Sequence, residues 1–442
     1  MTESQRQPTL RQALTAPGTL RLLLASALVG IPVSLIAFVF IGFEHKLQHW
    51  VWESAPEALG YSVSPWWWGL PTLALAGLLA APVITRMAGA GGHVPVFGIG
   101  GATTTPRELP SVALAALVCL PLGVILGPEA PLMALGSGIA LICVRAARRA
   151  AQPQLTAVLG MAGSTAAIST IFGSPLIPAV MVLEAAGLGG VRLVVLILPA
   201  LVASGVGALV FTGFGHWTGL SIGSLALPQK PPTELLDAAD FLWGIPMAAL
   251  IGALVAAGKL LGLRTHRLVG VSAVRIILCA LAVGISITAY ALATGRSPGE
   301  VALSGQIVIG ALAADPGAWA VGSLVALAVF KLIGWGIALG SLRGGPIFPA
   351  ITIGAAVGIA CGSLPGFGMA PALAAGICAA GVAATRLPVT GVVLAAALLG
   401  KDAITLMPLM VISSVAALLV EVLLDRPRAS GVEIDVGDAK TG

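Results

Sequence analysis

Charged residues are scarce in this 442-residue sequence. Asp, Glu, Lys and Arg together make up 9% of it, whereas 57% of the residues are hydrophobic and the mean hydropathy is +1.02. A soluble domain of this length could not hide so much apolar surface, so the composition excludes an ordinary soluble protein and predicts an integral membrane protein. Apolar blocks recur from Arg21 to Asp425, which leaves no stretch for a sizeable soluble domain.

Paired cysteines and clustered histidines are also lacking. The cysteines stand singly inside apolar segments, and we interpret them as packing residues. No histidines pair at metal-ligand spacing, and none has an evident serine partner. We therefore expect no metal and no cofactor, and an intramembrane enzyme is disfavoured, although an enzyme and a structural scaffold remain alternative classes. The residues concerned are Cys119, Cys143, Cys279, Cys361, Cys378, His45, His49, His93, His216 and His266.

The net charge of +5 comes from basic residues in short clusters between apolar blocks. Because Lys and Arg concentrate in the cytoplasmic loops of membrane proteins, we expect these clusters and both termini on the cytoplasmic side of the cell membrane. The surroundings are then a lipid bilayer, and nucleic acid is not an expected partner. The clusters lie within residues 6–21, 145–149, 259–275 and 426–428.

Glycine and proline are abundant, with 57 and 30 copies. In lipid they interrupt helices, and a broken helix survives only where protein or a cavity covers its freed backbone, which favours a transporter or channel. A polar stretch over residues 225–240 divides the chain into halves of similar size. We predict a polar cytoplasmic leader (1–20), a first transmembrane repeat (21–218), an extracellular linker (219–239), a second repeat (240–425) and a short cytoplasmic tail without a regulatory domain (426–442).

The two halves share interrupted segments in the same order. Residues 127–136 and 345–354 both read G-P-x-x-P-x-x-x-x-G, and about 40 residues after each comes a second proline-containing element, at 174–183 and 387–394. Corresponding breaks in two halves predict a binding site at their interface. If the basic loops of both halves are cytoplasmic, equivalent elements run in opposite directions.

The string Gly127-Pro128-Glu129-Ala130-Pro131 predicts a turn that opens a helix, because proline is tolerated in a first helical turn. The free N–H groups of that turn would offer an anion site within the membrane. Glu129 is the sole acid between Glu108 and Glu184, and a central intramembrane acid costs about 2.5–3.5 kcal/mol to insert. We interpret Glu129 as a gate that swings out when protonated; the alternative is an acid favoured by the helix dipole.

Four further ionisable residues have two interpretations each. Glu184, at the end of an apolar run, is either part of a proton route or an acid at a helix end. His93 follows a glycine-rich break and is either near the pore or a structural histidine. Arg343 and Arg386 could draw anions into a vestibule or extend to the membrane surface.

These motifs resemble, in the same order, those of the ClC family of chloride channels and proton-coupled chloride transporters, over nearly the whole chain. Residues 127–131 resemble the family's G-K/R-E-G-P motif, whose glutamate is the gate, and Glu129 falls on it. Residues 344–349 resemble G-G-x-F-x-P, with Ile347 where phenylalanine is usual and Phe348 one place later. Residues 91–95 occupy the place of G-S-G-I-P, and residues 172–184 resemble the F-N-A-P-L stretch and its helix.

The resemblance implies an all-α, ClC-like integral membrane protein of two inverted repeats of tilted, partly re-entrant helices. It also implies a homodimer with one pathway in each subunit. The expected function is passive or proton-coupled transport of a small anion, chloride first and another anion such as fluoride as the alternative. Glu129 is the expected gate, with protons as a further transported ion and Glu184 as a proton route. The expected anion-binding residues are Gly127, Pro128, Ala130, Gly92, His93, Gly345, Pro346, Ile347 and Phe348.

Three departures from the family pattern concern the inner end of the pathway. The serine that helps to hold the central anion is absent, because its place falls on Gly92 or His93. Ala429 stands where the pore tyrosine is usual, and the internal proton-relay glutamate aligns with Ala185. The resemblance therefore predicts a retained outer gate and altered coupling.

Overall fold

The computed structural model describes residues 9–16, 18–100, 103–146, 153–187, 190–218, 226–233 and 235–425. Helices dominate that part of the chain, and its β pairing is a single isolated bridge between Gly127 and Gly345. Nine segments of the described residues are long and apolar enough to cross a membrane. The predicted all-α, multi-span membrane fold is confirmed.

The helices fall into two series of similar length. The first series is α1 (Leu10–Thr15), α2 (Thr19–His49), α3 (Ala55–Ala58), α4 (Gly69–Arg86), α5 (Leu109–Cys119), α6 (Glu129–Ala146), α7 (Pro153–Phe172), α8 (Leu176–Ala185) and α9 (Gly190–Thr218). The second is α10 (Ala238–Val269), α11 (Ala273–Thr294), α12 (Gln306–Ala314), α13 (Val321–Ser341), α14 (Ile347–Cys361), α15 (Met369–Thr385), α16 (Pro388–Leu399) and α17 (Ala403–Leu424).

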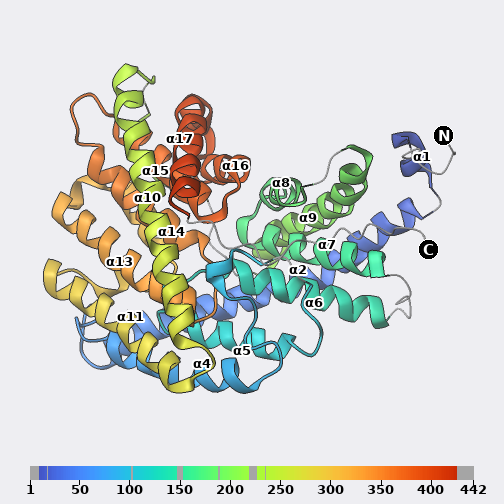
Figure 1. The fold of residues 1–442 in the computed structure, drawn as a ribbon, viewed down its shortest axis with the longest axis horizontal. Helices are drawn as coiled ribbons and strands as arrows, with labels where there is room; N and C mark the ends of the chain where they lie inside the picture. The colour runs from blue at the N-terminus through green and yellow to red at the C-terminus, as the bar shows by residue number, and fades with distance from the viewer. Residues whose placement is uncertain are drawn as a thin grey trace, which may run out of the picture.

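The packing of the first series is repeated in the second. In the first, α6 packs on α7, and α2 packs on both α7 and α9; in the second, α14 packs on α15, and α10 packs on both α15 and α17. In Figure 1, α6 to α9 lie on one side of the molecule and α10 to α17 on the other. The internal repeat predicted from two short motifs therefore extends to the helices around them.

Equivalent elements of the two halves also meet each other. Helix α4 packs on its counterpart α11, and α8 packs on its counterpart α16. Between them, the N–H of Gly127 donates to the carbonyl of Gly345 at 2.7 Å, and the N–H of Gly345 donates back to the carbonyl of Gly127. Such reciprocal, antiparallel pairing of equivalent residues is what a two-fold relation produces. The halves are therefore inverted repeats.

Small residues allow the closest helix approaches, and they too occur in matched pairs. A Cβ at Gly136 in α6 would overlap the carbonyl of Gly163 in α7, and a Cβ at Gly354 in α14 would overlap the carbonyl of Gly376 in α15. Without a water-driven hydrophobic force between helices in lipid, such close backbone packing is a main source of association.

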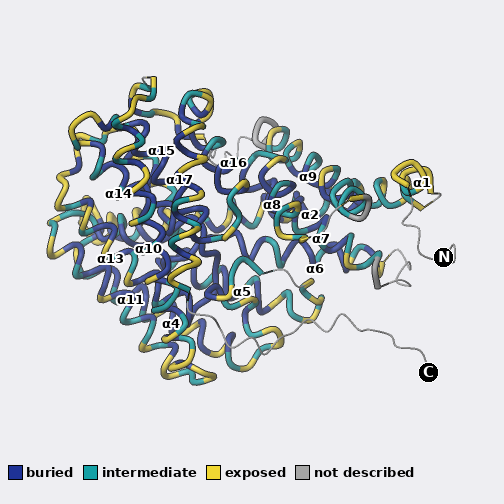
Figure 2. Tube along the Cα trace, turned by 45° about the horizontal axis from the view of Figure 1, so that its top comes forward, coloured by how far each residue is buried: buried dark blue, intermediate teal, exposed yellow. Residues whose placement is uncertain are grey.

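Several helices are too short to cross a bilayer, which takes about 20 residues. Helices α8, α12 and α16 have 10, 9 and 12 residues, and α14 has 15. Of these, α14 is buried over most of its length, as is α15 beside it, and Figure 2 shows the buried trace concentrated in the middle of the molecule. The predicted partly re-entrant helices are these segments.

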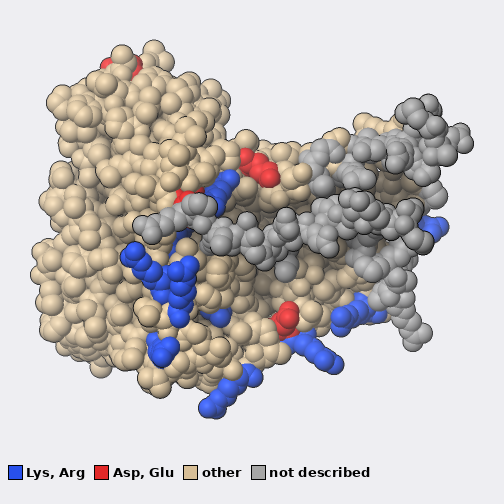
Figure 3. All heavy atoms as spheres, in the orientation of Figure 1, with Lys and Arg blue, Asp and Glu red and all other residues tan. Residues whose placement is uncertain are grey.

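The linker and the chain ends are described only in part. Within the linker, the N–H of Leu227 donates to the carbonyl of Leu398, and Lys230 pairs with Asp402 at 2.7 Å, so this segment lies on the turn between α16 and α17. The face in Figure 3 carries few acidic side chains, and Lys and Arg gather over its middle and lower parts. The predicted tail 426–442, with Ala429, lies outside the described residues.

Candidate functional site

The two G-P-x-x-P turns meet at the centre of the protein. The bridge between Gly127 and Gly345 places the first turn of α6 beside the first turn of α14. Helix α6 begins at Glu129, as the position of the prolines predicts, and α14 begins at Ile347 after the cap residue Pro346. Two positive helix ends therefore face one small region.

The carboxylate of Glu129 occupies this region. Its Oε1 accepts a hydrogen bond of 2.9 Å from the backbone N–H of Phe348, in the first turn of α14. The side chain is fully buried, and Oε2 has no hydrogen-bond partner among the described residues. Among the described residues, backbone dipoles and no basic side chain hold this buried carboxylate, and one of its oxygens is without a hydrogen bond.

Glycine is required on both sides of this carboxylate. A Cβ built at Gly127 or at Gly345 would overlap the Glu129 carboxyl group. The ring of Phe348 packs on Phe172 at the end of α7, with 5.7 Å between the ring centres. The structure thus brings together Gly127, Pro128, Glu129, Ala130, Gly345, Pro346, Ile347 and Phe348 of the predicted site.

The third predicted break lies beside the second turn. Arg343 is 6% exposed; its Nε donates to the carbonyl of Ala90 at 2.9 Å, which ties residues 89–92 to the loop before α14. Ala90 and Gly92 both have positive φ, 48° and 97°. Arg343 is therefore engaged with backbone carbonyls, and its side chain does not extend to the membrane surface. His93 is exposed and lies against Gly100, and no described contact joins it to Glu129.

Glu184 caps a helix of the other half. Its Oε1 accepts from the N–H of Val389 at 2.7 Å, and its Oε2 accepts from the N–H and the hydroxyl of Thr390 at 2.6 and 2.5 Å. These are donors of the first turn of α16, which have no partners within that helix. The carboxylate at the end of α8 thus stabilises the start of α16, and both of its oxygens are occupied.

Removing this cap should reduce stability. We expect Glu184→Ala to lower the free energy of unfolding by about 1–2 kcal/mol, because loss of a cap leaves N–H donors unpaired. Thermal unfolding in detergent measures the change. Glu53→Ala is the matched control, since Glu53 is 56% exposed in its pair with His49 and exposed pairs contribute little. Equal stability of the two variants would contradict the capping role.

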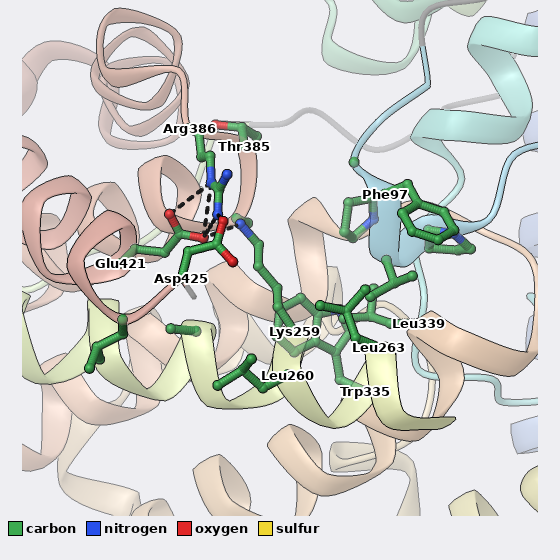
Figure 4. A pocket seen from close by; sticks show the side chains of 17 residues that line it. Phe97, Lys259, Leu260, Leu263, Trp335, Leu339, Thr385, Arg386, Glu421 and Asp425 are labelled. Carbon is green, nitrogen blue, oxygen red and sulfur yellow. Dashed lines mark hydrogen bonds and ion pairs between the residues drawn. The ribbon is translucent and has the colours of Figure 1, made fainter. Parts of the chain in front are cut away.

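A second group of charged residues lines a cavity of about 140 Å³. Lys259 of α10 and Arg386, between α15 and α16, both bind the carboxylate of Glu421 in α17, and Arg386 also binds Asp425 (Figure 4). The cavity extends to Pro346, the cap residue of α14. For Arg386 the sequence allowed two interpretations, a vestibule residue or a surface residue. Sequence reasoning did not identify Glu421, although an acid inside an apolar helix is a signal of a functional residue.

The two tyrosines of the chain lie away from the described cavity. The hydroxyl of Tyr290 donates to Glu300 on the turn after α11, and neither Tyr290 nor Tyr61 lines the cavity that ends at Pro346. The predicted loss of the pore tyrosine hydroxyl rests on Ala429, which lies outside the described residues, so it stays a prediction.

Comparisons with known proteins agree with this architecture. The sequence profile of the family described as voltage gated chloride channel matches residues 96–421. A protein named putative ion-transport protein YfeO, from Escherichia coli, is 29% identical over 345 residues, which cover 77% of this chain and 78% of its own. The YfeO protein of Shigella flexneri matches to the same extent.

Two solved structures share the fold. The crystal structure of a CLC-type fluoride/proton antiporter superposes with a TM-score of 0.68 at 18% identity, over 90% of this chain and 95% of its own. That of a slow cyanobacterial Cl⁻/H⁺ antiporter gives a TM-score of 0.73 at 16% identity, over 92% and 95%. With the profile match over most of its length, the chain belongs to the voltage gated chloride channel family.

Proposed function

We propose that this protein carries small anions across the membrane along a path gated by Glu129, with chloride as the expected anion. The observation that carries the proposal is the hydrogen bond from the Phe348 N–H to Glu129 Oε1, at the facing ends of α6 and α14. A carboxylate on a helix N-terminus occupies the place where a mobile anion would bind. Family membership supports the same function.

The backbone donors suit transient binding. Helix ends and N–H groups attract an anion without a full cationic charge, so the anion can enter and also leave. When Glu129 takes up a proton, it loses its charge and its advantage over a mobile anion at the Phe348 N–H. Opening at this gate then requires movement of the Glu129 side chain. Its unpaired Oε2 and the lack of a basic partner among the described residues favour that movement.

Fluoride or another small anion is the alternative substrate. One structure with this fold is that of a fluoride/proton antiporter, and Gly92 or His93 stands where a central serine is usual in the family. Transport by this chain is either passive or coupled to protons. Both solved structures named above are of proteins described as antiporters that exchange an anion for protons. The capping contacts of Glu184 favour a structural role for that residue over a proton route.

We further propose a homodimer in the cell membrane with both termini in the cytoplasm. One chain provides both turns that hold Glu129, which supports one pathway in each subunit. Exposed apolar side chains on α17, among them Ile404, Leu419 and Leu423, are available for a second subunit or for lipid. The basic residues between spans support the orientation.

Flux through purified protein in liposomes tests the proposal. We expect faster chloride efflux than from protein-free liposomes, and a panel of chloride, fluoride and nitrate gradients should show which anion moves fastest. Repeating the assay with a pH gradient separates passive from coupled transport, because a coupled carrier moves protons against their own gradient. Liposomes that are no more permeable to any of these anions than protein-free ones would contradict the proposed function.

A further inference from the structure

The cavity that ends at Pro346 has an unusual charged wall. Its other lining residues are mostly apolar or small, and in Figure 4 the acidic and basic side chains gather on one side, with Phe97 on the opposite side. Pro346 precedes Ile347 and Phe348, whose N–H holds Glu129. The cavity therefore approaches the anion site that we propose at the start of α14.

Two cations converge on one buried carboxylate in this wall. The side chain of Glu421 is 1% exposed; its Oε1 accepts from Lys259 Nζ at 2.8 Å, and its Oε2 accepts from Arg386 Nε at 2.8 Å. The ammonium of Lys259 also donates to the carbonyl of Ala383, at the end of α15, at 2.6 Å. Both cations are held in position by backbone geometry as well as by Glu421.

Arg386 adopts a strained backbone conformation. Its φ is +61°, in the left-handed region, which is unfavourable for a residue other than glycine. The same residue ends α15 as its C-cap. Its side chain, with 43% exposure, reaches from this turn to Glu421 and Asp425. The left-handed turn that ends α15 thus presents the Arg386 cation to the cavity.

The charges of this group balance. Lys259 and Arg386 face Glu421 from α10 and from the turn after α15, and Asp425 is the other acid beside Arg386. With two positive and two negative charges, the group has no net attraction for a further anion. If Glu421 takes up one proton, it becomes neutral, and one bound anion can supply the missing negative charge. The net charge of the group then stays at zero.

We propose that Glu421 is a second, inner gate, and that one small anion binds between Lys259 and Arg386 when Glu421 is protonated. The proposal rests on the proposed anion transport and specifies its inner end. It makes entry of one anion into the cavity dependent on uptake of one proton. The charged carboxylate of Glu421 then occupies the anion position in the cavity, just as the carboxylate of Glu129 occupies the anion position at the first turns of α6 and α14.

The alternative is a static clamp. Glu421 joins α10, the turn after α15 and α17, and a buried ion group can serve only to fix helices in place. A clamp predicts that substitutions change stability and leave the protons taken up with the anion unchanged. The number of protons bound per anion therefore separates the two interpretations.

Calorimetry of chloride binding to the full chain in detergent measures this number, by titration in two buffers with different heats of ionisation. The Glu129→Gln background removes proton uptake at the outer gate. In that background we expect about one proton for each chloride bound in the cavity at neutral pH, and no proton uptake after the further change Glu421→Gln. Equal proton uptake with and without Glu421 would overturn the proposal.

Two further variants keep the test decisive. If Glu421→Gln alone does not fold, Lys259→Gln/Glu421→Gln removes both partners of an ion pair and leaves no unpaired charge between them. It should fold and lose both the proton uptake and at least about tenfold in chloride affinity at this site; retained uptake would again contradict the proposal. Asp402→Asn, at an ion pair outside the cavity, is the matched control and should keep the uptake.

The flux assay distinguishes failure of this proposal from failure of the proposed function. If the wild-type protein moves no anion, the proposed function fails, and the inner gate fails with it. If flux is present and depends on Glu129, but proton uptake does not depend on Glu421, only the inner gate is wrong.

Discussion

Chloride flux through the Glu129→Gln variant should lose the part of its pH dependence that comes from Glu129, and at pH 7.5 it should exceed wild-type flux by about tenfold or more. An amide has nearly the shape of the acid but carries no charge, so it resembles the protonated gate at every pH. A hydrogen bond to a charged group contributes about 1.5–3 kcal/mol, and each 1.4 kcal/mol corresponds to a factor of ten. Removing the charge that binds the Phe348 N–H should therefore favour the open state by at least that factor.

The wild-type protein should approach the flux of this variant as the pH falls, because protonation of Glu129 has the same effect as the substitution. Efflux from liposomes between pH 4.5 and 7.5 measures both proteins. Glu57→Gln, on the exposed surface of α3, is the matched control and should keep the wild-type pH dependence. If Glu129→Gln has the same flux and the same pH dependence as the wild type, Glu129 is not the gate.

Local chemistry made much of the fold predictable. Proline in a first turn and glycine before it indicate where a membrane helix begins, and both α6 and α14 begin within two residues of such a proline. The repeated spacing of these turns predicted two related halves. The antiparallel contact between Gly127 and Gly345 follows from the two-fold relation between the halves. The order of the motifs alone does not specify that relation.

The partners of individual side chains were harder to predict, because they lie far apart in the sequence. Glu129 binds an N–H at Phe348, and Glu184 caps a helix that begins at Pro388. Isolated acids in apolar segments were correctly recognised as unusual, but the spacing along one helix could not show which donors they meet. His93 was predicted from its motif alone, and no described contact places it at Glu129.

The inner charged group illustrates the same limit. Lys259 belongs to a basic cluster that was interpreted only as a signal of orientation, whereas the structure places its ammonium on Glu421. Arg386 and Glu421 belong to other helices, and each alone is compatible with the end of a span near the membrane surface. Only the packing of α10, α15 and α17 against one another brings the three residues together.

The second large effect is expected at Gly345. Its backbone conformation is open to alanine, but a methyl group there would overlap Oε2 of Glu129. We expect Gly345→Ala to expel the carboxylate from the Phe348 N–H and to give a flux at pH 7.5 close to that of Glu129→Gln. Liposome efflux measures this, and Gly310→Ala, where a methyl group would meet no atom within 4 Å, is the matched control and should behave as the wild type.

A double substitution separates this mechanism from general damage to the bridge. Neighbouring residues that act through one contact show a coupling of about 0.5–3 kcal/mol, whereas independent changes add. If the methyl group acts by displacing the carboxylate, Gly345→Ala should change flux by less than about twofold in the Glu129→Ala background, because the overlapping group is gone. If the methyl group instead breaks the pairing of Gly127 with Gly345, flux should change equally with and without Glu129. That result would mean that glycine is needed here for contact between the two halves and not for the gate.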